Sequence, residues 1–156
     1  KLVYNQNGGM EKIMWDKVIS TIQLLKSKGL RVDAIGWQAH LRNNKFSDDD
    51  LNQLSSLIDW AHENNMEFHI TELNLWVKEE NFDKNEVKNW QADTYSKIYE
   101  LALSKKQNGP VVINHWGLLD RKGNNQLNKN ILSLYDNQFN PNLALERLRN
   151  VIVNQK

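Results

Sequence analysis

The fold is decided by two short stretches, Ala34-Ile35-Gly36-Trp37-Gln38-Ala39-His40-Leu41 and Phe68-His69-Ile70-Thr71-Glu72-Leu73-Asn74. Each begins as an apolar run of strand length, rich in β-branched or aromatic residues, and each ends in polar side chains. Between them lies an amphipathic segment whose apolar residues recur at helical spacing. A strand, a helix and a second strand in this order predict a βα unit of a parallel sheet.

The same alternation occurs four times along the chain. We expect strands at about residues 2–5, 32–38, 67–73 and 111–114, with helices over about 10–28, from Ser47, over about 86–105 and after a cap at Asn140. Four such units fit two α/β architectures, a complete doubly wound sheet or half of an eight-stranded barrel. The pattern alone does not choose between them.

Composition narrows the class of protein. The chain has 156 residues, a net charge of +1 and no cysteine. This length predicts one compact domain over residues 1–156, and the balanced charge argues against a nucleic-acid partner. No apolar run approaches the roughly 20 residues that cross a bilayer, and thiol chemistry is excluded. Because the chain starts at Lys1 without an initiator Met, we expect a piece of a larger protein.

Polar side chains gather where three of the expected strands end. The two-residue period of a strand puts on a common face Gly36 with Gln38 and His40, Ile70 with Glu72 and Asn74, and Asn114 with Trp116. A carboxylate such as Glu72 at the end of a buried strand is costly without partners, and His40 and Gln38 are placed to bond it. We interpret the cluster as a site, although Glu72 alone fits a structural role equally well and His40 alone fits a structural role better.

Taken together, these strand ends resemble the C-terminal half of the catalytic barrel of glycoside hydrolase family 10, the endo-β-1,4-xylanases. Segment 34–41 resembles the sixth-strand signature of the family, and segment 68–74 resembles its seventh-strand Ile-Thr-Glu-Leu-Asp. Further matches follow in chain order: Leu2-Val3-Tyr4-Asn5, Gln91-Ala92-Asp93 with Tyr95, His115-Trp116-Gly117 with Asp120, and Leu132 to Asp136 before Pro141. The resemblance implies strands five to eight, with their helices, of a (β/α)8 TIM barrel.

The resemblance also implies a function, that of a retaining endo-β-1,4-xylanase-like hydrolase acting on xylan. Glu72 corresponds to the family's nucleophile and His40 to the residue that orients it, while Gln38, Trp116, Asn5 and Asn74 correspond to substrate-binding positions. No metal or organic cofactor is implied. The family's general acid/base belongs to the fourth strand, so this chain is expected to lack it and to be inactive alone.

Partners and location follow from the same resemblance. The implied partners are xylan or a related β-1,4-linked polysaccharide and the missing N-terminal half of the barrel, or a second copy, because an isolated half exposes two sheet edges. The implied location is secreted, cell-surface or periplasmic. Neither nucleic acid nor a membrane is an expected partner.

Three departures from the family pattern keep other interpretations open. Asn74 stands where the family has Asp, Asn7 stands where it has an aromatic residue, and residues 121–125 lack its second tryptophan. A degenerate, binding-only polysaccharide-recognition barrel fits these departures. An independent doubly wound domain binding a small ligand is a third interpretation, which discards the motif matches. If the chain acts alone, Asp120 is the first candidate for a replacement acid.

Overall fold

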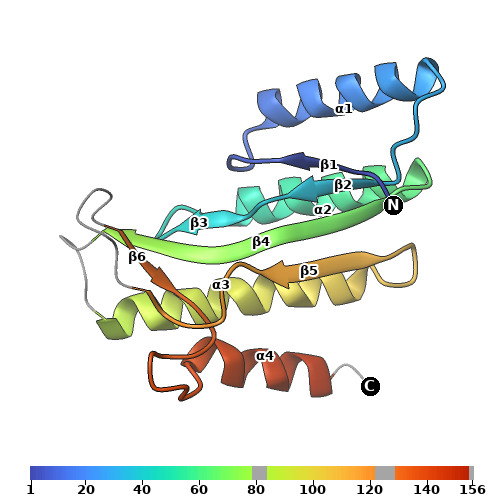
Figure 1. The fold of residues 1–156 in the computed structure, drawn as a ribbon. Coiled ribbons are helices and arrows are strands. Elements are labelled where there is room, and N and C mark those ends of the chain that lie inside the picture. The colour runs from blue at the N-terminus through green and yellow to red at the C-terminus, as the bar shows by residue number, and fades with distance from the viewer. Residues whose placement is uncertain (79–83, 122–128, 155–156) are drawn as a thin grey trace.

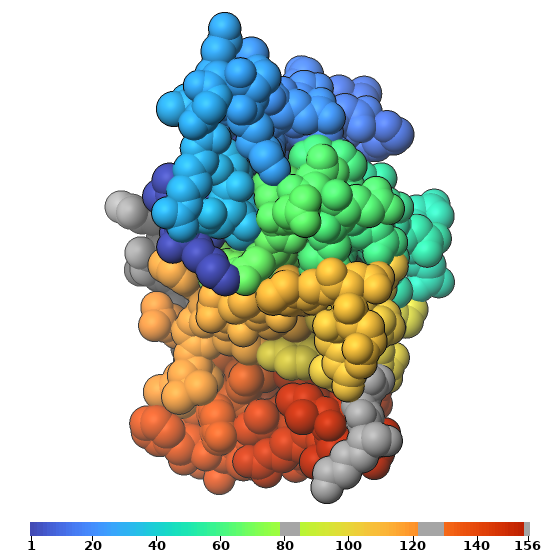
Figure 2. All heavy atoms as spheres, turned by 90° about the vertical axis from the view of Figure 1, so that its right-hand side faces the viewer, coloured from blue at the N-terminus to red at the C-terminus, as the bar shows by residue number. Residues whose placement is uncertain are grey.

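The computed structural model describes residues 1–78, 84–121 and 129–154. The elements alternate in the order β1 (Val3–Gln6), α1 (Lys12–Ser27), β2 (Ala34–Trp37), β3 (His40–Arg42), α2 (Asp48–Glu63), β4 (Glu67–Lys78), α3 (Lys84–Ser104), β5 (Val111–His115), β6 (Lys129–Leu132) and α4 (Leu143–Val153). The four predicted alternations of strand and helix are confirmed, and β3 and β6 are additional. In Figures 1 and 2 the chain runs from α1 at the top to α4 at the bottom.

The main sheet is parallel, with its strands in the chain order β1-β2-β4-β5. Its register pairs Tyr4 with Ile35, Ile35 with Phe68, and Phe68 with Val111. The predicted parallel pairing of sequential strands is therefore confirmed. A doubly wound sheet reverses its strand order at a switch point, and this sheet does not, so the doubly wound interpretation is wrong.

The second half of β4 belongs to a smaller sheet. There β3 pairs with β4 in parallel, and β6 pairs with it on the other side in antiparallel orientation, at the left-hand end of β4 in Figure 1. We expected this strand to end near Leu73. It continues to Lys78 because Leu73, Leu75 and Val77 keep alternating into the core.

Local chemistry sets the helix boundaries. The predicted capping box of α2 is confirmed, because Ser47 Oγ accepts from the Asp50 backbone N–H and the Asp50 carboxylate accepts from the Ser47 N–H. The predicted cap of the last helix at Asn140 is wrong. Asn142 is the N-cap of α4, and its side chain donates to Asp120 and to the Ser133 carbonyl instead of to the helix.

The hydrophobic core lies between the sheet and the helices. Its fully buried side chains come from both layers and include Trp15, Ile22, Ile35, Trp37, Leu54, Ile58, Phe68, Ile70 and Tyr95. The indole of Trp37 also donates from Nε1 to the Gly8 carbonyl at 2.9 Å, which ties the loop after β1 to β2. Removal of this apolar surface from water fixes the helices against one face of the sheet.

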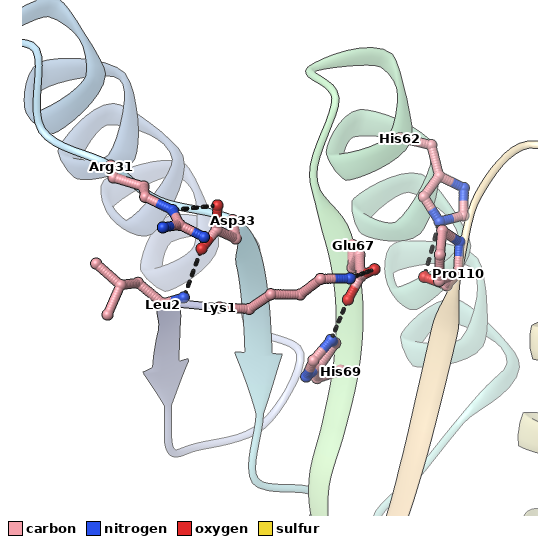
Figure 3. Close-up of polar contacts among 8 residues, drawn as sticks. All are labelled: Lys1, Leu2, Arg31, Asp33, His62, Glu67, His69 and Pro110. Carbon is pink, nitrogen blue, oxygen red and sulfur yellow. Dashed lines mark hydrogen bonds and ion pairs between the residues drawn. The ribbon is translucent and has the colours of Figure 1, made fainter.

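Polar contacts cover the end of the sheet at which the strands begin. Figure 3 shows Glu67 paired with Lys1 and with His69, whose Nε2 lies 2.9 Å from Glu67 Oε2. Hydrogen bonds from Lys1 and then His69 hold the pKa of Glu67 below its ordinary value. His62 has its Nε2 3.2 Å from the Pro110 carbonyl. His62 and His69 thus take part in structural contacts at the opposite end of the strands from Glu72.

Candidate active site

Glu72 is positioned by an irregularity in β4. The pairing of β4 with β5 shifts register between Ile70 and Leu73, as a β-bulge does. Ile70 is fully buried in the core, whereas Thr71 turns to the opposite face and donates to Asn5 Oδ1 at 2.9 Å. The prediction that Ile70 shares a face with Glu72 and Asn74 is wrong, because the bulge breaks the alternation between them.

His40 is positioned by a second irregularity. β2 ends at Trp37, and the fully buried Ala39 adopts a left-handed φ of 58°. The predicted unbroken alternation from Gly36 through Gln38 to His40 is therefore wrong. Such a backbone costs of order 1–3 kcal/mol and is concentrated at functional sites. Its effect here is to start β3 at His40, directly opposite Asn74 on β4.

Three polar side chains meet where these strands pair. His40 Nε2 lies 3.4 Å from Glu72 Oε2, and His40 Nδ1 lies 3.0 Å from Asn74 Oδ1. An amide oxygen only accepts, so this contact puts a proton on Nδ1. Nε2 then donates to Glu72 only when the imidazole carries both protons. Asn74 is 1% exposed, and its Nδ2 finds no partner among the described residues.

Two tryptophans surround His40. Trp76 stacks on the imidazole with ring centroids 5.1 Å apart and an interplanar angle of 26°, and Trp116 meets it edge-on at 6.4 Å. Trp116 is 51% exposed, so its indole is open to a ligand. Sequence reasoning placed Trp116 at the site but missed Trp76. The alternation of Leu73, Leu75 and Val77 was the signal that the strand continues far enough to bring Trp76 there.

The remaining predicted binding residues lie in different surroundings. Asn5 is exposed on β1, with its side-chain oxygen bonded to Thr71. The backbone N–H of Gln38 donates to the Gln6 carbonyl. The Gln38 side chain makes no hydrogen bond with the described residues, so the predicted bond from Gln38 to Glu72 is not seen.

Three other positions from the sequence analysis lie at the ends of strands or after them. Asn114 is exposed at the end of β5. Asn7 is also exposed, while most of the loop after Asp120, residues 122–128, lies outside the described residues.

Asp120 forms a structural junction. Its Oδ1 accepts from the Ser133 backbone N–H at 2.7 Å and from Asn142 Nδ2 at 3.1 Å. These bonds tie the segment after β5 to the start of α4. The two bonds hold the Asp120 carboxylate in this junction, which weighs against Asp120 as a replacement acid.

His115 lies behind Trp116 against two tyrosines of α3. The Tyr99 hydroxyl lies 2.9 Å from His115 Nε2, within hydrogen-bond distance, and the rings of Tyr95 and Tyr99 pack against the imidazole. Burial lowers the pKa of His115 to about 4, so the ring is neutral at pH 7. Burial also raises the pKa of both tyrosines. This cluster supports the strand end that carries Trp116.

Within the described residues, no group of three His, Cys, Asp or Glu side chains is arranged to hold a metal ion. The helices of that part of the chain are too short or too polar to cross a membrane. The groups that the structure brings together at the site are a carboxylate, an imidazole and two indole rings.

A comparison with protein families identifies the family of the chain. The model of glycosyl hydrolase family 10 matches residues 1–151. The chain belongs to glycosyl hydrolase family 10. Its members are glycosidases with a TIM-barrel catalytic domain, and the resemblance seen in the sequence is confirmed. A direct comparison with curated protein sequences finds no match.

Solved family 10 structures share the fold of this chain. It superimposes on xylanase 10B of Thermotoga petrophila RKU-1 in complex with xylobiose with a TM-score of 0.83 and 21% identity, covering 99% of this chain and 46% of that one. For xylanase 10B of Thermotoga maritima the TM-score is 0.80 with 22% identity, over 99% and 47% of the two chains. For an endo-1,4-beta-xylanase of Caldicellulosiruptor owensensis it is 0.78 with 23% identity, over 96% and 48%. The chain thus corresponds to about half of a family 10 barrel.

Proposed function

We propose that this chain is the C-terminal half, strands five to eight, of a retaining endo-β-1,4-xylanase-like hydrolase acting on xylan. The observation that carries the proposal is the 3.4 Å contact between Glu72 Oε2 and His40 Nε2, on a half barrel of a glycosidase family. A carboxylate held beside an imidazole at the carboxyl ends of parallel strands is placed as catalytic groups of such barrels are.

In this proposal Glu72 attacks the anomeric carbon of the bound sugar. The bond to the leaving oxygen breaks, a glycosyl-enzyme ester forms, and water later hydrolyses it. His40 orients the attacking carboxylate. Asn74 accepts a hydrogen bond from Nδ1 of His40 and so keeps the imidazole in place. Trp116 offers its exposed face to a sugar ring, while Asn5 and Gln38 contribute polar groups nearby. The mechanism requires no cofactor.

The reaction also needs a second carboxyl group about 5–5.5 Å from the first, to protonate the leaving oxygen and then activate water. Asp120 is bonded to Ser133 and Asn142 and does not suit that role. We propose that the acid comes from the other half of the barrel, in the same parent protein or as a separate polypeptide. A substrate of this kind also implies an exported protein, secreted, cell-surface or periplasmic.

The test is an assembled barrel, in which this chain is combined with the complementary half of a family 10 domain or studied within its parent protein. Reducing sugar should be released from xylan. Glu72→Gln should lower kcat by about 10³-fold or more while xylotriose affinity changes only a few-fold, because the nucleophile acts in the chemical step. Glu63→Gln, an exposed charge change on α2, is the matched control. Equal loss of binding and turnover in Glu72→Gln would contradict the proposal.

A binding-only barrel is the second candidate, and Asn74 is the observation that favours it. The amide gives His40 an acceptor without the negative charge of a carboxylate, and its Nδ2 remains buried without a partner among the described residues. Xylan binding by the assembled wild-type barrel with no release of reducing sugar would establish this alternative.

A further inference from the structure

The small sheet beyond Glu72 carries a row of four side chains that the proposed chemistry does not use. Arg42 on β3 pairs with Trp76 on β4, Trp76 pairs with Ile131 on β6, and Ile131 pairs with Arg121. Residues directly opposite each other in neighbouring strands project to the same face of a sheet. We call this row, Arg42, Trp76, Ile131 and Arg121, the arginine-flanked platform.

The platform adjoins the candidate active site. Arg42 lies two residues after His40 on β3, with the buried Leu41 between them, so both side chains are on one face. The stacking of His40 on Trp76 places that face next to Glu72. Trp76 follows Glu72 by four residues, which is about 13 Å along a strand. A ligand that passes Glu72 can therefore reach the platform.

The centre of the platform is apolar and both ends are cationic. Trp76 and Ile131 are partly exposed, and Arg42 and Arg121 are exposed. Across four strands the two arginine Cα atoms are about 14 Å apart. Neither guanidinium pairs with a carboxylate of the described residues, whereas Arg31 and Arg147 pair with Asp33 and Asp93. The guanidinium of Arg121 lies over Gly117, the neighbour of Trp116.

We propose that the arginine-flanked platform binds the uronic acid side group of a substituted xylan. The apolar face of the uronic acid ring rests on Trp76 and Ile131, and Arg42 binds its carboxylate through the two parallel N–H donors of the guanidinium. Arg121 adds positive potential from the other end. This inference rests on the proposed function, since the acidic group is carried to the platform by the xylan chain at Glu72.

The test compares two probes on the 156-residue chain by isothermal titration calorimetry. One is xylotriose, and the other is xylotriose bearing a 4-O-methylglucuronic acid group. The acidic probe should bind at least about ten-fold more tightly, since hydrogen bonds to charged groups are the strong ones, and the advantage should shrink at high salt. Arg42→Gln should abolish the advantage, Arg42→Lys should retain part of it, and Arg121→Gln should reduce it, while xylotriose affinity stays unchanged.

Lys45→Gln is the matched control, because it removes one exposed charge close to β3 but outside the row. Equal effects of Lys45→Gln and Arg42→Gln would mean attraction by net charge only and would overturn the inference. Equal affinity for the two probes, unaffected by Arg42→Gln, would also overturn it while leaving the proposed function intact. If the wild-type chain binds neither probe, the platform is wrong, while the proposed function is judged separately on the assembled barrel.

Discussion

The amide oxygen of Asn74 lies 3.0 Å from Nδ1 of His40. This contact fixes the plane of the imidazole whose other nitrogen faces Glu72. The family pattern that segment 68–74 resembles has an aspartate at the position of Asn74.

Replacing Asn74 by Leu tests whether this contact matters to turnover. The leucine keeps the branched shape, at a larger volume, but removes the acceptor, which leaves Nδ1 of His40 without its partner. A lost hydrogen bond to a buried group costs about 1–3 kcal/mol, so we expect kcat of the assembled barrel to fall about ten-fold. Asn74→Asp should retain or raise kcat, since a carboxylate is the stronger acceptor. An unchanged kcat in Asn74→Leu would show that His40 is held by Trp76 alone.

The 156-residue chain alone should not cleave glycosidic bonds. The absence of a general acid typically costs about 10²–10⁴ in rate, and the missing half of the cleft removes substrate orientation as well. The fairest substrate is an activated aryl xylobioside, whose leaving group needs little protonation. Turnover should not exceed that of the Glu72→Ala chain on this substrate or on xylan. Glu72-dependent hydrolysis of either substrate would contradict this expectation, and hydrolysis of xylan would mean that another carboxylate of the chain supplies the proton.

The chain should associate with itself when it is alone. Among residues 1–78, 84–121 and 129–154, β1 pairs only with β2 and β5 only with β4, so each presents an edge that no described strand covers. Light scattering at micromolar concentrations should detect dimers or larger species. Ile113→Pro should shift the population toward monomer, because the N–H of Ile113 faces the free edge of β5 whereas its neighbours on β5 donate to β4. A compact monomer for the wild-type chain would contradict this expectation.

Gly36 is required by the close approach of three strands. A Cβ at this position would lie 2.7 Å from Asn5 Oδ1 and 2.9 Å from Val3 Cγ1. We expect Gly36→Ala to lower the free energy of unfolding by about 1–3 kcal/mol, as overpacking does. Gly29→Ala is the comparison, because a Cβ there meets nothing within 4 Å and only the positive φ is strained. Urea unfolding measures both. A loss for Gly36→Ala no larger than for Gly29→Ala would show that β1 yields to the added methyl.

His115 makes stability depend on pH. Its pKa is about 4 in the folded chain against an ordinary value of 6.5, so the unfolded chain binds this proton more tightly. Stability from the neutral ring is complete above about pH 6.5 and is lost as the pH falls toward 4, by about 2–3 kcal/mol at pH 4.5. His115→Gln keeps an acceptor for Tyr99 but does not titrate. The difference in unfolding free energy between the two chains should change by that amount between pH 7 and 4.5, and a constant difference would contradict the assignment.

The sequence predicted the fold well because its signals are local. Each signal spans only a few residues: an apolar run with β-branched residues for a strand, the Ser47–Asp50 capping box for a helix start, and Gly29 for a helix end. The structure has the predicted feature at each of these places. The order of the parallel strands came from the resemblance to the family 10 barrel, because the alternation of strands and helices left two architectures open. The strand was predicted to end near Leu73, because polar residues follow its apolar run there. The alternation of buried residues continues through Val77, and β4 continues with it.

The candidate site was less predictable because two backbone irregularities build it. A strict two-residue period assigns Ile70 and Glu72 to one face, but the bulge separates them. The left-handed backbone of Ala39 likewise interrupts the strand between Gly36 and His40. A positive φ at an alanine has no signature in the sequence. Trp76 reaches His40 only because both irregularities bring β3 alongside the extension of β4.

The pairing pattern of β4 has a consequence for how the chain folds. β2, β3, β5 and β6 all pair with β4, and before it is present only β1 and β2 can join. Without β4, residues 1–66 can form two helices and a two-stranded ribbon, which is marginal by itself. The rest of this sheet therefore forms only when residues 67–78 take part, and destabilised variants of this strand should delay every pairing that involves it rather than loosen one edge.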